Sequence, residues 1–484
     1  MMRRMSVLVL ALSLIVAGCD HPAPEYAASV SQEDRDFGAQ QHPQLLAQFG
    51  GEYRGPQEGY VQRLGATVAD AAGLGGRCTF TLVNSDVVNA FAVPGCYIYV
   101  TRGLMAIVSS EAELASVLGH EVGHIVARHS ERQQSRSLWS MLGVIVVSLT
   151  GSERLTRLAG AAAEMFTLRY SRGQEYEADE LGIRFLRRAG YDPYAAGDML
   201  GALDRQQAFL TDSGGRDAAR GVPEWALSHP LTGKRVERAH HLAEETGLAD
   251  DALPDKAPAY LAAIDGLLYG DDPEQGFVLG RRFAHPIMRI GFEAPEGFTL
   301  ANSPQAITLS GPAGVRGEFA GGPIPPGGLP AYVETMLPQL LGDVPAEIGM
   351  AQATVVNGLP AIIVPVRIAT RQGSLPLAVA AYDAGGGHAY HFAIVSPPSD
   401  ASAAAILRLF TSFHLLAPEE VARLRPRVVR VVIVAPGETE RSLARRVADP
   451  HGQALLTALN GPGAVHPGAH VKIVTFAGAD GAGS

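Results

Sequence analysis

The sequence of 484 residues is poor in three residue types, with three cysteines, three lysines and two tryptophans. It also lacks an excess of positive charge, because 49 acidic residues outnumber 39 basic ones and give a net charge of −10. That balance argues against nucleic acid as a partner, since nucleic-acid-binding surfaces are basic. The many arginines beside so few lysines indicate a GC-rich genome rather than a binding surface.

Long apolar runs are scarce as well. Beyond the first twenty residues, the run LWSMLGVIVVSL at 138–149 is shorter than the roughly 20 residues that a membrane-spanning helix needs. We expect a core or interfacial helix there, and contact of this segment with a membrane surface stays open. The hydrophobic share of 47% and the charged share of 18% are typical of a globular chain with about two to four domains.

Residues 1–19 predict an export signal. Two early arginines precede an apolar stretch that ends at Gly18-Cys19. This ending resembles the bacterial lipoprotein box, in which the cysteine is lipidated and becomes the first residue of the mature chain. The resemblance implies a membrane anchor at Cys19 that faces the periplasm, followed by a flexible tether at 20–30. Whether the anchor lies in the inner or the outer membrane stays open.

The most informative motif is HEVGH at 120–124. On a helix, residues four apart face the same way, so His120 and His124 can bind one metal ion. Glu121 beside them can take a proton from water, which is the arrangement of zinc hydrolases. Apolar residues at spacings of three and four over 111–130 predict the helix. The alternative is two satisfied histidines on an ordinary amphipathic helix.

A second helix is predicted within 171–193, where it ends at Gly190. Glu175 and Asp179 stand four apart on one face of it. We expect Glu175 to be the third metal ligand and Asp179 to accept a hydrogen bond from a ligand histidine. Glu177 and Glu180 are expected to be solvated surface charges. An exposed helix with four unrelated acids is the alternative.

These blocks resemble the zinc metallopeptidase family M48, which includes CaaX prenyl proteases, HtpX and the periplasmic BepA-like proteins. HEVGH and SRGQEYEAD are preceded by NAFAVPGCYIYVTRGLM and followed by LSHPLTGKRVERAHHL, in the family's order. The resemblance covers about residues 30–245. It implies a mainly α, zincin-like domain with a small β-sheet at 31–250. It also implies one zinc ion per chain, held by His120, His124 and Glu175, with Glu121 as the catalytic base.

The same resemblance assigns two further parts of the site. It implies a hairpin beside the active-site helix, where a peptide substrate can add as an extra strand along Asn89, Ala90, Phe91 and Ala92.

His229 lies in a loop before Pro230. The resemblance implies that it is either a fourth ligand that must leave or an oxyanion donor, and that Arg235 stabilises the tetrahedral intermediate. The alternative for His229 is an ordinary loop histidine.

The two remaining cysteines lie near this hairpin. Where the family commonly has two glycines after the proline, this chain has Gly95-Cys96. Cys78 opens the run CTFTLVNS, a predicted neighbouring strand, so Cys78 and Cys96 can lie close enough to form a disulfide in an oxidising compartment. Two buried free thiols are the alternative.

The pattern changes after residue 250. Residues 251–284 predict a short helix and a turn-rich linker. Residues 285–418 alternate strand-like runs with two helical stretches, which predicts an α+β domain with its helices on one face of a sheet. This domain has no ligand or nucleophile spacing, so we interpret it as a binding or packing module.

Residues 425–476 resemble a LysM module, a small α+β unit that commonly binds N-acetylglucosamine chains of the cell wall. The matching positions include Gly437, Thr439, Asn460 and Gly468. The resemblance implies peptidoglycan as a partner, by analogy alone. A small packing domain without a ligand is the alternative.

The sequence therefore predicts a multidomain, lipid-anchored zinc endopeptidase whose protein substrates are misfolded or misassembled envelope proteins. Two other classes stay open. One is a chaperone or assembly factor whose zinc site is latent because His229 blocks it. The other is a wall-binding scaffold that acts through residues 425–476.

Overall fold

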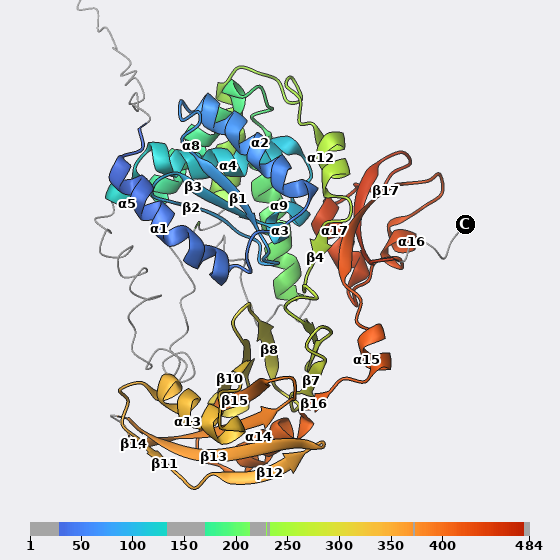
Figure 1. Ribbon diagram of the computed structural model, residues 1–484. Coiled ribbons are helices and arrows are strands. Elements are labelled where there is room, and N and C mark those ends of the chain that lie inside the picture. Colours follow the sequence, from blue (N-terminus) through green and yellow to red (C-terminus); the bar gives the residue numbers. More distant parts are fainter. Residues whose placement is uncertain (1–28, 133–169, 213–228, 230–232, 371–372, 479–484) are drawn as a thin grey trace, which may run out of the picture.

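The computed structural model describes residues 29–132, 170–212, 229, 233–370 and 373–478. The export signal with Cys19 and the apolar run at 138–149 lie outside these residues. Figure 1 shows a helical body around a small sheet, a C-terminal module beside it and a second body of β-sheet below. Among the described residues, none of the helices combines the length and the apolar composition that crossing a membrane requires.

The helical body contains the predicted peptidase domain. Its helices surround one central helix, α4, whose side chains are almost all buried. The helices are α1 (Gln32–Gln48), α2 (Pro56–Ala71), α3 (Arg102–Ile107), α4 (Glu111–Val126), α5 (His129–Arg132), α8 (Arg172–Arg188), α9 (Ala195–Asp212), α11 (Gly233–Glu245) and α12 (Ala257–Ile264).

A small sheet with strand order β1-β3-β2 lies beside α4. Its strands are β1 (Thr79–Val83), β2 (Ala90–Val93) and β3 (Tyr97–Thr101). β1 pairs with β3 in parallel and β2 pairs with β3 antiparallel, so β2 is an edge strand of this sheet.

The parallel register places Thr79 opposite Tyr97, which brings the preceding cysteines together. Cys78 and Cys96 form a disulfide with an S–S distance of 2.01 Å. Cys96 has a φ of 62°, a left-handed conformation that glycine adopts more easily. The family commonly has a second glycine at this turn. This chain has a cysteine instead, and that cysteine is one end of the disulfide.

The C-terminal module is a β-α-α-β unit. It consists of β17 (Arg427–Ile433), α16 (Glu440–Ala444), α17 (Gly452–Asn460) and β18 (His470–Phe476). β17 pairs with β18 and also with β4 (Leu268–Tyr269), so the segment predicted as a linker completes the module's sheet.

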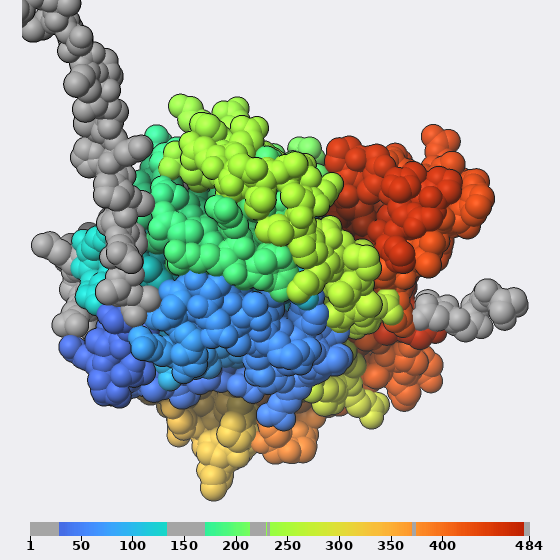
Figure 2. Space-filling model, turned by 90° about the horizontal axis from the view of Figure 1, so that it is seen from above, coloured from blue at the N-terminus to red at the C-terminus, as the bar shows by residue number. Residues whose placement is uncertain are grey.

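This module and the helical body have one continuous hydrophobic core. Leu455, Leu459 and Ile473 belong to the same buried cluster as Leu118 and Leu203. Seen from above, the red module lies directly against the helical body (Figure 2). Residues 425–476 are therefore packed as part of the helical body rather than tethered to it.

A buried lysine strengthens this contact. Lys472 Nζ donates hydrogen bonds to the backbone oxygens of Ile107 at 2.8 Å and Val108 at 2.7 Å, immediately before α4 begins. Burial lowers the pKa of Lys472 to about 7, against the opposing charge of Glu113. The module thus holds the segment that leads into the central helix.

The lower body is built from two sheets. An eight-stranded sheet has the order β11-β13-β14-β15-β10-β9-β8, with β12 also on β13, and a four-stranded sheet has the order β16-β7-β6-β5. The strands are β5 (Phe277–Leu279), β6 (Arg282–His285), β7 (Ile290–Glu293), β8 (Thr299–Asn302), β9 (Ile307–Ser310), β10 (Arg316–Pro323), β11 (Ala346–Ile348), β12 (Gln352–Val356), β13 (Leu359–Thr370), β14 (Gly373–Asp383), β15 (His388–Val395) and β16 (His414–Leu415).

The prediction that both helices of this domain cover one face was wrong. α13 (Gly328–Leu341) packs on the face with Val379 and Ala381, whereas α14 (Asp400–Ser412) packs on the opposite face with Ala380 and Tyr382. The reason is that consecutive residues of β14 point to opposite sides and are apolar on both, so both faces need a cover. The short helix α15 (Pro418–Ala422) then leads into the C-terminal module.

We predict that Lys472→Met lowers the free energy of unfolding of the helical body by roughly 1–3 kcal/mol, because two buried backbone oxygens lose their donor. Thermal unfolding followed by circular dichroism measures this effect. The control is Lys234→Met, which replaces an exposed lysine. Equal melting temperatures for the two variants would contradict the role assigned to Lys472.

Candidate metal centre

The central helix α4 carries the HEVGH motif. It begins at Ser110, whose side chain accepts a hydrogen bond from the backbone N–H of Glu113 at 3.0 Å, while Glu111 and Glu113 lie at the positive end of the helix dipole. The C-terminal half of the helix places His120 and His124 on the side that faces α8.

The second helix, α8, begins with a capping box. The side chain of Ser171 accepts from the backbone of Gln174, and the side chain of Gln174 accepts from the backbone of Ser171. This fixed start places Glu175 in the first turn and Asp179 one turn later, both toward α4.

Glycines set the distance between the two helices. A Cβ atom on Gly182 would lie 3.1 Å from the backbone nitrogen of His120, and one on Gly123 would lie 3.0 Å from the backbone oxygen of Ala178. Gly119 meets Gly182 in the same way. The backbones can approach this closely only because these positions have no side chain, and the approach brings the acids of α8 within reach of the histidines of α4.

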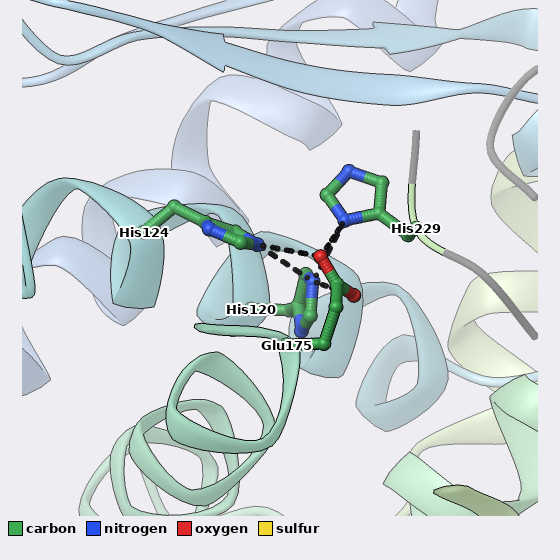
Figure 3. Close-up of side chains that lie close together, drawn as sticks. All are labelled: His120, His124, Glu175 and His229. Carbon is green, nitrogen blue, oxygen red and sulfur yellow. Dashed lines mark hydrogen bonds and ion pairs between the residues drawn. The ribbon is translucent and has the colours of Figure 1, made fainter. Parts of the chain in front are cut away.

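Four buried side chains converge at this contact (Figure 3). His120, His124, Glu175 and His229 each expose at most 2% of their surface and offer ligand atoms that all lie within 4.8 Å of one another. His120 Nε2 lies 3.0 Å from His124 Nε2 and 3.6 Å from Glu175 Oε2. His229 Nδ1 lies 3.0 Å from Glu175 Oε1 and 3.2 Å from His120 Nε2.

Glu121 lies next to this group and is 1% exposed. Its carboxyl oxygen Oε1 is 3.5 Å from His229 Nε2, and its carboxyl group accepts a hydrogen bond from the backbone of Ala92 in the edge strand β2. Glu121 thus faces both the cluster and the predicted substrate strand. Within β2, the ring of Phe91 stacks on Tyr99. Just before β2, the backbone N–H of Asn89 donates to Thr101 Oγ1 and its backbone oxygen accepts from the N–H of Thr101, where the pairing with β3 begins.

Asp179 and Arg235 hold the outer side of the cluster. Asp179 Oδ1 lies 2.9 Å from His120 Nδ1, the nitrogen that faces away from the cluster. Arg235 donates Nε and Nη2 to Asp179 at 2.9 and 2.7 Å, and its Nη1 lies 2.9 Å from Glu175 Oε2. All three guanidinium nitrogens therefore contact groups of this chain.

The sequence prediction did not assign to the site two residues that contact His124, nor a third that lies one contact farther out. The ring of Tyr170 stacks on His124 with centroids 3.8 Å apart. His129 Nδ1 lies 2.8 Å from His124 Nδ1, and Glu177 Oε2 lies 3.0 Å from His129 Nε2. The prediction of a solvated surface charge was wrong for Glu177, because its carboxylate also accepts a fork of two hydrogen bonds from Arg132. The arginine and the second histidine lie in a short helix whose position no local pattern indicates.

Burial and charge together set the ionisation of the cluster. Burial raises the pKa of Glu121 to about 8 and lowers the pKa of His124 well below its usual range. Burial alone would also raise the pKa of Glu175, but His229, His120 and Arg235 beside it bring it below the usual value. Burial lowers the pKa of His129 to about 3, so its ring is neutral near pH 7.

The residues present fit a divalent metal ion. The carboxyl groups of Glu175 and Asp179 are buried against the guanidinium of Arg235, and Glu121 adds a third buried carboxyl group beside the cluster, so a bound cation would stabilise the ionised forms of these acids. Two or three imidazole nitrogens with one carboxylate form the donor set that zinc takes in hydrolases. The Asp179 contact leaves Nε2 of His120 as the bare nitrogen, which is the form that binds a metal.

Comparisons with known proteins identify this part of the chain. The model of Peptidase family M48 matches residues 56–243. Those residues form an M48 peptidase domain. The beta-barrel assembly-enhancing protease of Yersinia pestis is 33% identical over 197 residues, which cover 38% of this chain and 39% of that protein. The mitochondrial metalloendopeptidase OMA1 of Arabidopsis thaliana is 39% identical over 173 residues, which cover 36% of this chain and 32% of that protein.

The match thus spans between about a third and two fifths of the length of these curated relatives. Among solved structures, cyanobacterial PsbP from Synechocystis matches 30% of this chain with 14% identity and a TM-score of 0.23. A score this low carries no argument about the fold or the function of this chain. What the comparisons establish is the family of the domain that contains the four converging side chains.

We predict that Gly182→Ala lowers zinc affinity about tenfold or more, because the added methyl group meets the backbone of α4 and moves Glu175 from the histidines. Competition with a chromophoric chelator measures the affinity. Gly173→Ala in the same helix is the control, because a Cβ atom there meets nothing within 4 Å. Matching affinities in both variants would show that the helix spacing does not set the site.

Proposed function

We propose that the chain is a zinc-dependent endopeptidase that hydrolyses peptide bonds of envelope proteins. The observation that carries this proposal is the convergence of four buried metal-binding side chains with Glu121 beside them. The M48 domain and the metalloendopeptidase relatives support the same reaction class.

Each side chain has a role that follows from its position. His120, His124 and Glu175 would hold the ion, which supplies polarisation of the scissile carbonyl and an acidified water. Glu121 takes a proton from the attacking water and returns it to the leaving amine, for which a carboxyl group with a pKa near the working pH is well matched. Arg235 holds Glu175 and Asp179 in place through its three engaged nitrogens.

We propose that the substrate pairs with the edge strand β2, whose four residues are buried within the described structure. An extended peptide that pairs with the backbone of Asn89, Ala90, Phe91 and Ala92 would pass Glu121, to which the backbone of Ala92 is bonded. Since strand addition reads the backbone rather than side chains, such a site accepts unfolded segments of varied sequence.

The proposed location is the bacterial envelope. It rests on the lipoprotein-like ending at Cys19 and on relatives described as beta-barrel assembly-enhancing proteases. The disulfide between Cys78 and Cys96 agrees with an oxidising compartment. Unfolded or misassembled envelope proteins are the substrate class that we propose, and a pull-down on purified peptidoglycan tests whether residues 425–476 also bind wall glycan.

We predict that Glu121→Gln lowers the rate of casein cleavage by roughly 10²–10⁴-fold while the zinc content stays at the wild-type level, since the amide cannot accept a proton. A digest followed by gel electrophoresis, with metal analysis of the same samples, tests this. Full activity in the variant would rule out Glu121 as the base, and an inactive wild-type protein with zinc bound would favour a non-proteolytic role.

A latent peptidase is the second candidate, favoured by the position of His229. Its Nδ1 lies within 3.2 Å of both Glu175 and His120, inside the donor cluster, so the ring can take the coordination position that a water needs. An inactive resting enzyme would result, which becomes active when the ring of His229 leaves this position. This candidate shares the metal centre and differs only in what fills its fourth position.

We predict that His229→Ala raises the rate of casein cleavage several-fold without loss of zinc, because removal of the ring frees the fourth position. His241→Ala, which removes an exposed histidine of α11, is the control. Initial rates of casein cleavage, with zinc content measured in parallel, show whether His229 blocks the fourth position. A lower rate at full zinc content would instead assign His229 to stabilisation of the oxyanion.

A further inference from the structure

The two histidines of the HEVGH motif are held from behind in different ways. The outer nitrogen of His120 meets a carboxylate directly, that of Asp179. The outer nitrogen of His124, its Nδ1, instead meets the Nδ1 of a second histidine, His129, at 2.8 Å. A carboxylate appears only one step farther out, where His129 Nε2 lies 3.0 Å from Glu177 Oε2.

A sharp turn of the chain creates this contact. α4 ends at Val126, and Arg128 takes a left-handed conformation with a φ of 53° before α5 begins at His129. The reversal places the ring of His129 against the edge of His124, with centroids 4.9 Å apart and planes at 71°. His129 is fully buried, so its ring nitrogens depend on these two neighbours for hydrogen bonds.

The directions of the hydrogen bonds from His124 through His129 to Glu177 follow from Glu177, at the outer end of this series. Both oxygens of Glu177 accept hydrogen bonds from Arg132, at 2.9 and 3.0 Å, so the group acts as an acceptor. His129 must therefore donate its Nε2–H to Glu177. A neutral imidazole has one N–H and one bare nitrogen, which leaves Nδ1 of His129 as an acceptor. The only hydrogen that can fill the contact between the rings is the Nδ1–H of His124.

We propose that His129 and Glu177 are positioning residues that fix His124 as the Nδ1–H tautomer and so present its bare Nε2 to the metal. The inference rests on the metal centre of the proposed function. In the other tautomer, Nε2 of His124 would carry a hydrogen into the cluster and could not bind an ion. Hydrogen bonds from ligand histidines to outer groups also orient the ring and raise its basicity.

The arrangement also links the site to the protein surface. The side chain of Glu177 is 26% exposed and that of Arg132 is 45% exposed, whereas His129 and His124 are buried. The series of contacts from Arg132 through Glu177 and His129 to His124 thus runs from solvent to the metal centre. Changes at its outer end are therefore expected to reach the ligand without altering the core.

Zinc affinity of the purified full-length protein tests the proposal. We expect His129→Ala and Glu177→Ala each to weaken zinc binding about 10–100-fold in a chelator competition assay. The double variant is expected to bind zinc no more weakly than the single variant with the lower affinity, because both substitutions break the same series of hydrogen bonds. Glu177→Ala removes the acceptor at a partly exposed position, so it remains informative where His129→Ala fails to fold.

The matched control is Glu180→Ala in the same helix. Glu180 is 41% exposed and pairs with Arg184 and Arg238, on the side away from the cluster, so we expect unchanged zinc affinity. If His129 and Glu177 had a purely structural role, their substitution would lower the melting temperature of the zinc-free protein and leave the zinc affinity of the folded fraction at the wild-type value. That result would overturn the proposal.

A second measurement reads the tautomer itself. Two-bond ¹⁵N–¹H correlation spectra of histidine-labelled, zinc-free protein distinguish Nδ1–H from Nε2–H rings. We expect His124 as Nδ1–H and His129 as Nε2–H in the wild type, and loss of the single His124 form in Glu177→Ala. The Nε2–H form of His124 in the wild type would overturn the proposal. Neither measurement depends on peptide cleavage, so a failed protease assay leaves this test intact.

Discussion

The close backbone contact between α4 and α8 is the constraint on which the site depends. Gly119 and Gly123 on one helix meet Gly182 and Ala178 on the other, and the missing side chains let the two backbones approach. That approach brings an acid of α8 to imidazoles of α4, although 51 residues separate Glu175 from His124 in the sequence. Interiors are close-packed and the neighbouring atoms here belong to the backbone, so an added methyl group at this contact requires the facing backbone to shift by a few tenths of an ångström.

The surrounding structure holds this contact at both ends of α4. At its start, Lys472 of the C-terminal module binds the backbone immediately before the helix, and the module's apolar residues join the same core. Beyond its end, the turn at Arg128 carries His129 back against the ligand His124. Between them, Arg235 ties two acids of α8 together. The peptidase centre is therefore a product of the whole helical body, including a module that the sequence presents as separate.

The sequence predicted those features that depend on short-range spacing. Helical periodicity and HEVGH were sufficient to place His120, Glu121 and His124 on one helix, and the four-residue spacing placed Glu175 and Asp179 on one face of another. What spacing could not provide are contacts set by turns and by long-range packing. Glu177 reads as one of several acids on a helix, and only the left-handed turn at Arg128 gives it a buried partner. The faces covered by α13 and α14 were likewise beyond a local pattern, because apolar residues on both sides of a strand do not say which helix covers which.

The most direct test of the account is a crystal structure of the purified protein with diffraction data collected on both sides of the zinc absorption edge. The account predicts one anomalous peak per chain, bonded to His120 Nε2, His124 Nε2 and a carboxylate oxygen of Glu175, at about 2.0–2.2 Å from each. A metal ion bound elsewhere in the chain, with Glu175 outside its coordination sphere, would contradict it.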